Sequence, residues 1–407
     1  MAVTFEPQAR WWLWVDGVRT SLLPDWVSYR CQFPRTGVGG FDLVYPLNGS
    51  GADVLAGDVW SQVSVELMAE DGTWSEPPNG RMVPLRRSVD YAAGTLTITG
   101  ASYGWLLGKA VRWFDEGEDV DGKKVFVNAS AGTILQWHYY WAVVRRALQN
   151  VTIDFDGFAD SDGVLWVDRF DVEYERGVTL RAIWDGFESD GLVWRTLGDT
   201  VQVAQERFAD VPTETATMWA GVDCEADRIE VSMEDAAGAV MVTGQNNQIG
   251  RALLSNVGPW GRWEVSVSHS GATTEATLER LADVELASRG LSREGATVTL
   301  LPSSGFRPLD NLWPGQVARV RIGTDPRQVF RWGVSRWGGP DVWGSGAPWS
   351  QEIAGVIEEI VLADDGTRCT VSLSIGDRSE SATEVLARTV RGVTGGRVAR
   401  RAVTGVA

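Results

Sequence analysis

Runs of residues that alternate between apolar and polar are the most frequent pattern along the chain. Such alternation has the period of a half-buried β-strand, and clusters of Gly, Asp, Asn and Pro separate the runs as they do between strands. The 46 glycines and 15 prolines supply the residues that turns require. The pattern predicts strands at residues 63–67, 95–99, 297–301, 317–322 and 369–375.

Helical spacing is confined to three segments. Apolar residues recur three and four positions apart in residues 178–188 and 274–288, which predicts amphipathic helices. Residues 131–148 are apolar nearly all round, which predicts a buried helix. Gly290 follows the last segment, where a left-handed C-cap favours a residue without a Cβ. The predicted fold class is therefore mainly β with α/β insertions.

Two parts of the chain repeat one order of features. In residues 53–59 and again in residues 310–317, an Asp and a Leu precede a Gly-polar-Val turn that opens a strand. Each part continues with a return strand, a glycine-containing hairpin turn (residues 91–95 and 363–367) and a closing strand. We infer two copies of one small antiparallel β-domain, with chance similarity between two β-rich segments as the alternative.

Composition narrows the classes of function. A chain of 407 residues with 44% hydrophobic and 22% charged residues is an ordinary folded protein of several domains. No stretch reaches the roughly 18–20 apolar residues of a membrane span. The net charge of −17 argues against a protein that holds phosphate backbones. Only the end is basic, because five arginines and no acid follow Glu384.

One motif has the form of a catalytic nucleophile. Residues 100–104 fit the G-x-S-x-G pattern, with Ser102 between a predicted strand and an apolar stretch. A base would have to be His138 or His269, and the β-rich surroundings do not suit the parallel sheet of a hydrolase. The alternative is a small-residue exit from a strand into a helix, and we predict no catalytic residue. His138 lies among aromatic residues and is predicted to be buried with its hydrogen bonds satisfied.

Neither a metal nor a cofactor is expected. Residues 115–122, 154–157 and 160–163 are acidic turns, but none has the ligand spacing of an EF-hand, so solvated polar turns are favoured over calcium sites. The three cysteines are far apart and form no C-x-x-C pair, which predicts neither a disulfide framework nor a zinc site. These cysteines are Cys31, Cys224 and Cys369.

A tryptophan-rich segment at residues 331–350 interrupts the second β-domain. Four extended indoles present about 600–1,000 Å² of surface, more than the roughly 300–600 Å² of the largest apolar patch on a typical soluble monomer. We expect this segment to be covered, either by a protein or by sugar rings, and enrichment of Trp and Arg at interfaces favours protein. The candidate interface residues are Trp332, Trp337, Trp343, Trp349 and Arg336.

The order of features along the chain resembles that of the tail-hub (minor tail or baseplate hub) proteins of long-tailed bacteriophages, up to about residue 376. The features, in sequence order, are a Trp-led strand at residues 11–15, the turn at 57–59, a strand at 96–99 that runs into 100–107, a helix from 178 with strands at 192–194 and 201–203, and a helix from 274 followed by 307–315.

The resemblance implies two tube-type antiparallel β-barrel domains with mixed α+β domains between them. The boundaries that follow are residues 1–104 for the first barrel, 105–210 for an inserted α/β domain, 211–290 for a connecting region, 291–376 for the second barrel and 377–407 for the Arg-rich tail.

The same resemblance implies a non-enzymatic structural protein that forms a homotrimeric ring at the distal end of the tail tube. Six barrels in three chains would adapt a sixfold tube to threefold tip parts, and an acidic lumen would let DNA pass without binding it. The implied partners are the tail tube, distal tail, tip or fibre and tape measure proteins, in a virion assembled in the host cytoplasm. The alternatives are a cell-wall hydrolase, centred on Ser102 or an acid pair, and a sugar-binding tail module.

Overall fold

The computed structural model describes residues 8–58, 60–113, 122–188, 191–232, 237–244, 248–254, 261–268, 275–289, 293–322 and 351–376. Strands make up most of the regular structure in these segments, so the predicted mainly β fold class is confirmed. None of the described helices has the length and apolar character needed to cross a bilayer. Outside the described residues lie 115–121 of the acidic run, His269, Gly290, the Trp-rich segment with Trp332, Arg336, Trp337, Trp343 and Trp349, and the Arg-rich tail.

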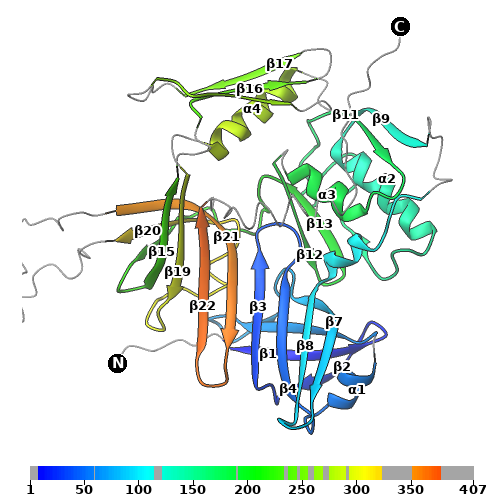
Figure 1. The fold of residues 1–407 in the computed structure, drawn as a ribbon, viewed down its shortest axis with the longest axis vertical. Coiled ribbons are helices and arrows are strands. Elements are labelled where there is room, and N and C mark those ends of the chain that lie inside the picture. Colours follow the sequence, from blue (N-terminus) through cyan, green and yellow to red (C-terminus); the bar gives the residue numbers. More distant parts are fainter. Residues whose placement is uncertain are drawn as a thin grey trace, which may run out of the picture.

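The amino-terminal β unit comprises the strands before residue 103 (Figure 1). Its strand pairs are antiparallel, in the order β3-β4-β8-β7-β5-β1-β2, with β6 beside β5. The alternation predicted from sequence is clear in β1, where Trp11 and Leu13 are buried and Trp12 and Trp14 lie on the other face. The elements are β1 (Ala9–Val15), β2 (Val18–Leu23), β3 (Ser28–Pro34), β4 (Gly40–Pro46), α1 (Ala52–Gly57), β5 (Gln62–Met68), β6 (Trp74–Ser75), β7 (Arg81–Asp90) and β8 (Thr95–Ser102).

An α/β region with its own core follows and packs two small sheets against helices. Helix α2 begins where the Oγ of Ser130 accepts a hydrogen bond from the Thr133 N–H. It ends at Val144, earlier than predicted, because Arg146 has a φ of 59°, which a right-handed helix cannot continue through. The elements are η1 (Tyr103–Gly108), β9 (Lys123–Ala129), α2 (Ala131–Val144), β10 (Thr152–Ile153), β11 (Phe170–Glu175), α3 (Leu180–Glu188), β12 (Leu192–Leu197) and β13 (Thr200–Gln205).

The carboxy-terminal β unit has the strand order β15-β19-β22-β21-β20-β14. Two of its strands come from residues 211–290, which the sequence assigns to a connecting region; their backbones pair with β19 and β20 and so lie within this unit. The strands are β14 (Ala216–Trp219), β15 (Cys224–Ser232), β19 (Arg293–Leu300), β20 (Val317–Ile322), β21 (Gln351–Asp364) and β22 (Cys369–Gly376).

A small layer is inserted between β15 and β19, beyond their ends in Figure 1. Helix α4 packs on a three-stranded sheet with the order β17-β16-β18. The approach is close, since a Cβ on Gly250 would collide with the backbone of Leu278 in the helix. The elements are β16 (Ala239–Thr243), β17 (Ile249–Leu253), β18 (Glu264–Ser268) and α4 (Glu275–Arg289).

The two β units form one continuous sheet, because β21 pairs with β3. Figure 1 shows β22, β21, β3, β4 and β8 side by side. A single hydrophobic core runs beneath both units and includes Trp11, Leu43 and Met82 from the first and Val298 and Leu373 from the second. The chain therefore presents two β units locked side by side, not two units on a tether.

Candidate assembly interface

The junction between the two β units is an antiparallel strand pair. Residues 359–364 of β21 lie opposite residues 29–34 of β3 in an unbroken register of six pairs. Arg35 extends the contact: its backbone N–H donates to the carbonyl oxygen of Glu358 at 2.8 Å, and its Nη1 lies 3.1 Å from the Oε1 of the same residue. Backbone hydrogen bonds and a charge pair thus fix the register.

The core face of this junction is fully buried. Leu362 lies opposite Cys31, and Ile360 lies opposite Phe33; none of the four is more than 1% exposed. Burial raises the pKa of the Cys31 thiol well above its usual range, so this cysteine stays a neutral, apolar core residue. The junction is therefore part of a shared core and holds the units rigidly.

The strand orders of the two units match. The series β3-β4-β8-β7-β5 in the first corresponds to β15-β19-β22-β21-β20 in the second. The units differ outside this series, since β1 pairs antiparallel with β5 whereas β14 pairs parallel with β20. The duplication that the sequence predicts is therefore present in the strand order.

A β-bulge at the same place strengthens this equivalence. In the β7–β8 hairpin the register shifts between Pro84 and Arg86, and in the β21–β22 hairpin it shifts between Ile357 and Glu359. Each hairpin turns through a glycine with positive φ, Gly94 at 70° and Gly366 at 81°. A bulge inserts one residue and bends the strand, so its recurrence marks corresponding positions in the two hairpins.

Each unit leaves one edge of the series open among the described residues. β15 pairs only with β19 and ends the sheet. In β7, residues 86–90 pair only with β8, whereas the corresponding residues 359–363 of β21 pair with both β22 and β3. Open strand edges carry unpaired backbone groups and readily accept another strand.

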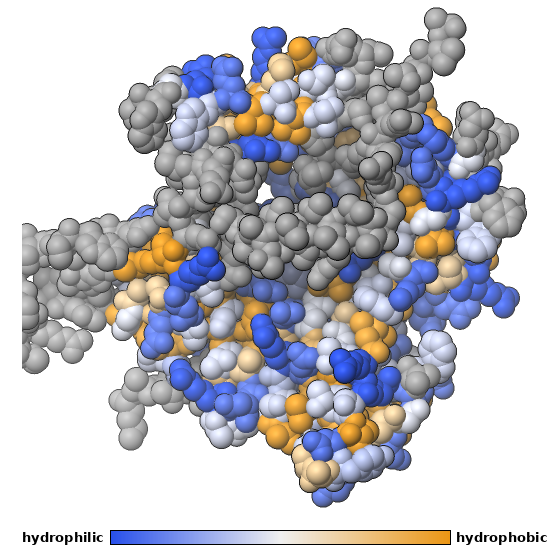
Figure 2. All heavy atoms as spheres, in the orientation of Figure 1, coloured by the Kyte–Doolittle hydropathy of each residue, from blue (hydrophilic) through white to orange (hydrophobic). Residues whose placement is uncertain are grey.

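The face of the continuous sheet that points away from the core is rich in short hydroxyl side chains. Cross-strand neighbours include Thr299 beside Ser372 and Thr297 beside Ser374. Where Figure 2 shows this side, hydrophilic residues are interspersed with small apolar patches. The hydroxyl residues of this face are Thr95, Thr97, Thr99, Thr297, Thr299, Thr370, Ser372 and Ser374.

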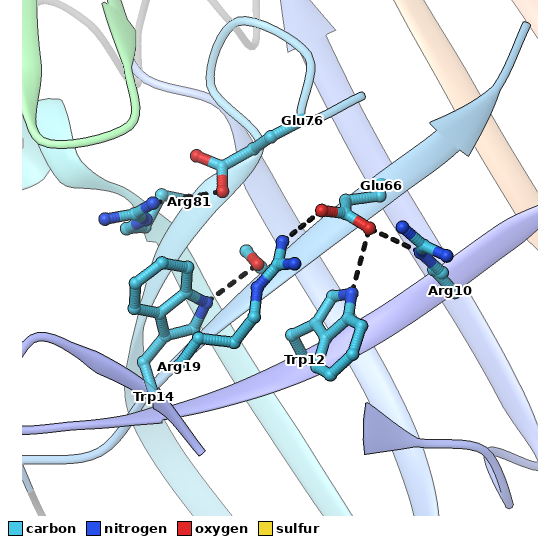
Figure 3. Close-up of polar contacts among 8 residues, drawn as sticks. Arg10, Trp12, Trp14, Arg19, Glu66, Glu76 and Arg81 are labelled. Atoms are coloured by element: carbon cyan, nitrogen blue, oxygen red, sulfur yellow. Dashed lines mark hydrogen bonds and ion pairs between the residues drawn. The ribbon is translucent and has the colours of Figure 1, made fainter. Parts of the chain in front are cut away.

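A second polar cluster lies on the outer face of β1, β2 and β5 (Figure 3). Glu66 is only 5% exposed, and its carboxylate accepts hydrogen bonds from Arg10, Arg19 and the indole N–H of Trp12. Burial alone raises the pKa of Glu66, but these hydrogen bonds outweigh it and lower the pKa overall. The guanidinium carbon of Arg19 also lies 4.3 Å from the centroid of the Trp12 ring. The cluster therefore links the side chains of β1, β2 and β5 on this face.

Glu66→Ala is expected to lower the free energy of unfolding by about 2–3 kcal/mol, because it leaves two arginines without their shared buried carboxylate. Glu70, whose side chain is 73% exposed and pairs with Arg307 at 3.3 Å, is the matched control. Glu70→Ala is expected to cost less than about 1 kcal/mol. Urea denaturation measures both, and equal losses would contradict the role given to Glu66.

Ser102, the serine of the G-x-S-x-G pattern, is completely buried. Its Oγ accepts a hydrogen bond from the Gly39 N–H at 3.0 Å, and its own N–H donates to the Gly39 carbonyl at 2.9 Å. It ends the antiparallel strand β8, and the 3-10 helix η1 follows. This is the strand-to-helix exit, and Ser102 ties the β3–β4 loop to β8.

In the described acidic turns, the carboxylates accept hydrogen bonds from backbone N–H groups of the same turn. Asp156 accepts from the N–H groups of Phe158 and Ala159, and Asp160 accepts from those of Asp162 and Val164. Such Asx turns are ordinary loop chemistry. In the described part of the chain no group of three or more His, Cys, Asp and Glu side chains is arranged to hold a metal ion.

His138 is buried as predicted, at 1% exposure, but the expectation that its hydrogen bonds are satisfied is wrong. Neither ring nitrogen has a hydrogen-bond partner among the described residues. The rings of Trp137 and Tyr174 pack edge-on against it at centroid distances of 4.9 and 5.0 Å. The aromatic neighbours that signal burial in the sequence offer no polar partner here.

No protein-family model matches the chain, and no curated protein matches it in sequence. Solved structures do match it. The chain is similar to the tail protein of Neisseria meningitidis MC58, with 12% identity and a TM-score of 0.54 over 91% of this chain and 96% of that one.

Two prophage proteins are similar to the same degree. For the 43 kDa tail protein of prophage MuSo2 from Shewanella oneidensis, identity is 13% and the TM-score 0.53, over 91% of this chain and all of that one. For prophage tail protein gp18 from Listeria monocytogenes EGD-e the values are 10% and 0.54, over 95% and 99%. The chain thus has the fold of phage tail proteins, and the resemblance seen in the sequence is confirmed at that level.

Proposed function

We propose that this chain is a structural tail-hub protein, of which three copies close into a ring at the distal end of a phage tail tube. One observation carries the proposal: the chain holds two β units of matching strand order, joined edge to edge in one sheet. A heterologous contact that repeats closes into a ring if its rotation completes a circle. Three such chains provide six similar units, which suits a sixfold tube above and threefold parts below.

The hydroxyl-rich face of the continuous sheet is assigned to the lumen. Short Ser and Thr side chains outnumber the arginines on this face, so DNA that passes it would form few phosphate contacts to break. Charged residues of this face are weakly acidic in sum, which adds short-range repulsion of phosphate. Among the described side chains of this face, the acids are Asp42, Asp90, Glu225, Asp227 and Glu359, and the arginines are Arg30, Arg86 and Arg228.

We further propose that the hub is not an enzyme. The similar solved proteins are tail proteins, and Ser102 is buried with its Oγ engaged to backbone. Cell-wall zymography of the purified chain is expected to show no clearing. Clearing that Ser102→Ala abolishes, while the variant remains folded, would support the hydrolase alternative instead.

The proposed partners are those of a tube end: the tail tube, distal tail and tip or fibre proteins, with the tape measure protein in the lumen. DNA would pass without specific binding, in a virion assembled in the host cytoplasm. The Trp-rich segment with Trp332, Trp337, Trp343, Trp349 and Arg336 remains a proposed contact for one of these proteins. Loss of tail-tip attachment in a Trp337→Ala variant, with the β units still folded, would support that contact.

Native mass spectrometry of the full chain tests the ring. The expected main assembly has three times the 44.5 kDa mass of one chain. Negative-stain images of this species are expected to show a closed ring with six densities around a central opening. Assemblies of two or four chains, or a closed ring without sixfold repeats, would contradict the proposal.

A further inference from the structure

We propose that the ring closes by antiparallel pairing of β7 in one chain with β15 in the next, in the register that β21 and β3 adopt within a chain. The proposed occupant of both open edges is a second copy of this chain. The inference deepens the proposed hub function and rests on it. Its basis is the junction already formed within the chain: β7 corresponds to β21 and β15 corresponds to β3, and among the described residues each of these two counterparts lacks a strand on the equivalent edge.

The shared bulge sets the correspondence between β7 and β21. Leu85 and Glu358 occupy the bulges, so Val89, four residues further on, corresponds to Leu362. Correspondence between β3 and β15 follows through their partner strands. The pair directly before the bulge residue is Pro84–Gly100 in one hairpin and Ile357–Ile375 in the other. Gly100 therefore corresponds to Ile375.

Gly100 lies opposite Phe41, which lies opposite Cys31; Ile375 lies opposite Ala296, which lies opposite Ile229. Ile229 therefore corresponds to Cys31. Since Leu362 lies opposite Cys31 within the chain, Val89 should lie opposite Ile229 of the neighbouring copy.

The burial of these residues agrees with a missing partner strand. Leu362 and Cys31, which meet at the formed junction, are both completely buried. Val89 and Ile229 pack against the same core but are only partly buried. Pairing the two open edges would cover both side chains and extend the core from one chain to the next. A neighbouring copy of this chain therefore fits the exposed apolar flank of each edge.

Charge on the other face fits the same register. Asp90 would lie opposite Arg228 of the neighbouring copy, one position from the Val89–Ile229 pair, and both side chains are exposed. Opposite charges directly across two strands stabilise pairing. Arg87 does not obstruct the edge, because its guanidinium donates to the carbonyl oxygens of Leu55 and Asp58 on the α1 side.

Disulfide formation in the full chain tests the register. Residues directly opposite in an antiparallel pair have Cα atoms about 4.5–5.5 Å apart, within reach of a disulfide. Within one chain Val89 and Ile229 are seven strand spacings apart, on the order of 30 Å along the sheet, so no intrachain bond is possible. The variant Val89→Cys/Ile229→Cys is therefore expected to give, on oxidation, covalent assemblies of up to three chains on non-reducing gels.

The matched control is Val89→Cys/Glu225→Cys, which moves one cysteine four residues along β15 and should cross-link little. Thermal melts of both variants establish that each is folded. Native mass spectrometry of the same samples separates the two proposals. Trimers without the disulfide between residues 89 and 229, or with equal cross-linking in the control, would be consistent with the proposed hub but would overturn the β7–β15 pairing. Absence of trimers would overturn both.

A charge exchange provides a second test that does not depend on a disulfide. Arg228→Asp places two carboxylates opposite each other, keeps the hydrogen bonds from the Ala92 and Ala93 N–H groups to the Asp90 carboxylate, and is expected to weaken trimer formation about tenfold, since the change recurs at three junctions. Asp90→Arg/Arg228→Asp restores opposite charges and is expected to recover most of the loss. Failure of the double variant to recover, with both variants folded, would show that the two positions do not meet.

Discussion

Leu362→Ala, at the junction between the β units, is expected to lower the free energy of unfolding by about 3–4 kcal/mol. Leu362 is completely buried between β22 and β3, where it lies opposite Val371 and Cys31. Truncation removes the transfer free energy of the side chain and leaves a cavity between strands that hydrogen bonds hold in place. Urea denaturation of the full chain measures the change.

Val361 is the matched control because it neighbours Leu362 on the same strand but lies on the opposite face, where it is half-buried. Val361→Ala is expected to cost less than about 1 kcal/mol. Equal losses of stability in the two variants would contradict the conclusion that the buried face of the junction stabilises the chain. The Leu362 variant should also form the proposed ring less readily, because β21 and β3 fix how the two units face each other.

The sequence predicts the single strands of the β units well, because each has one buried face and alternates accordingly. The predicted segments 63–67, 95–99, 317–322 and 369–375 all fall within strands β5, β8, β20 and β22. The helix predicted over residues 178–188 is α3 almost to the residue. Local periodicity and turn glycines contain this information.

The junction itself could not be predicted from sequence. Its two strands, β3 and β21, are more than three hundred residues apart, and neither alternation nor turn chemistry says which distant edge will pair with which. The interleaving of β15, the α4 layer and β19 is hidden for the same reason. These features depend on the packing of completed units, which no local pattern records.

The repeated turns illustrate a partial success. The sequence aligns the Gly-polar-Val turns at residues 57–59 and 315–317, but α1 ends at Gly57, five residues before β5, whereas Val317 already begins β20. When the two units are aligned at the shared bulge, the residue that corresponds to Val317 is Gln62. The motif would instead match Val317 with Val59, three residues earlier. The inference of two related units is supported by strand order, although the motif that prompted it is out of register.

His138 is expected to make the stability of the chain fall steeply in acid. Burial lowers its pKa to about 3, assisted by the positive charges of Arg112 and Lys124. The unfolded chain, with an ordinary histidine pKa near 6.5, therefore binds a proton between pH 6.5 and 3 that the folded chain does not. Stability from this group is complete above pH 6.5 and is lost as the pH falls through that window.

The size of the effect follows from linkage. Between pH 7.5 and pH 5 the loss due to His138 is about 2 kcal/mol, and it approaches about 4–5 kcal/mol near pH 3. His138→Phe keeps an aromatic ring among Phe126, Trp137 and Tyr174 but cannot be protonated. The variant should lose about 2 kcal/mol less than the natural chain over the first interval, as measured by urea denaturation at each pH.

The comparison isolates one group, because carboxylates that titrate in the same range are present in both chains and their contributions cancel. Parallel pH profiles for the two chains would mean that His138 is hydrated or hydrogen-bonded in solution. A steeper loss in the natural chain would instead establish a buried, neutral imidazole in the α/β region.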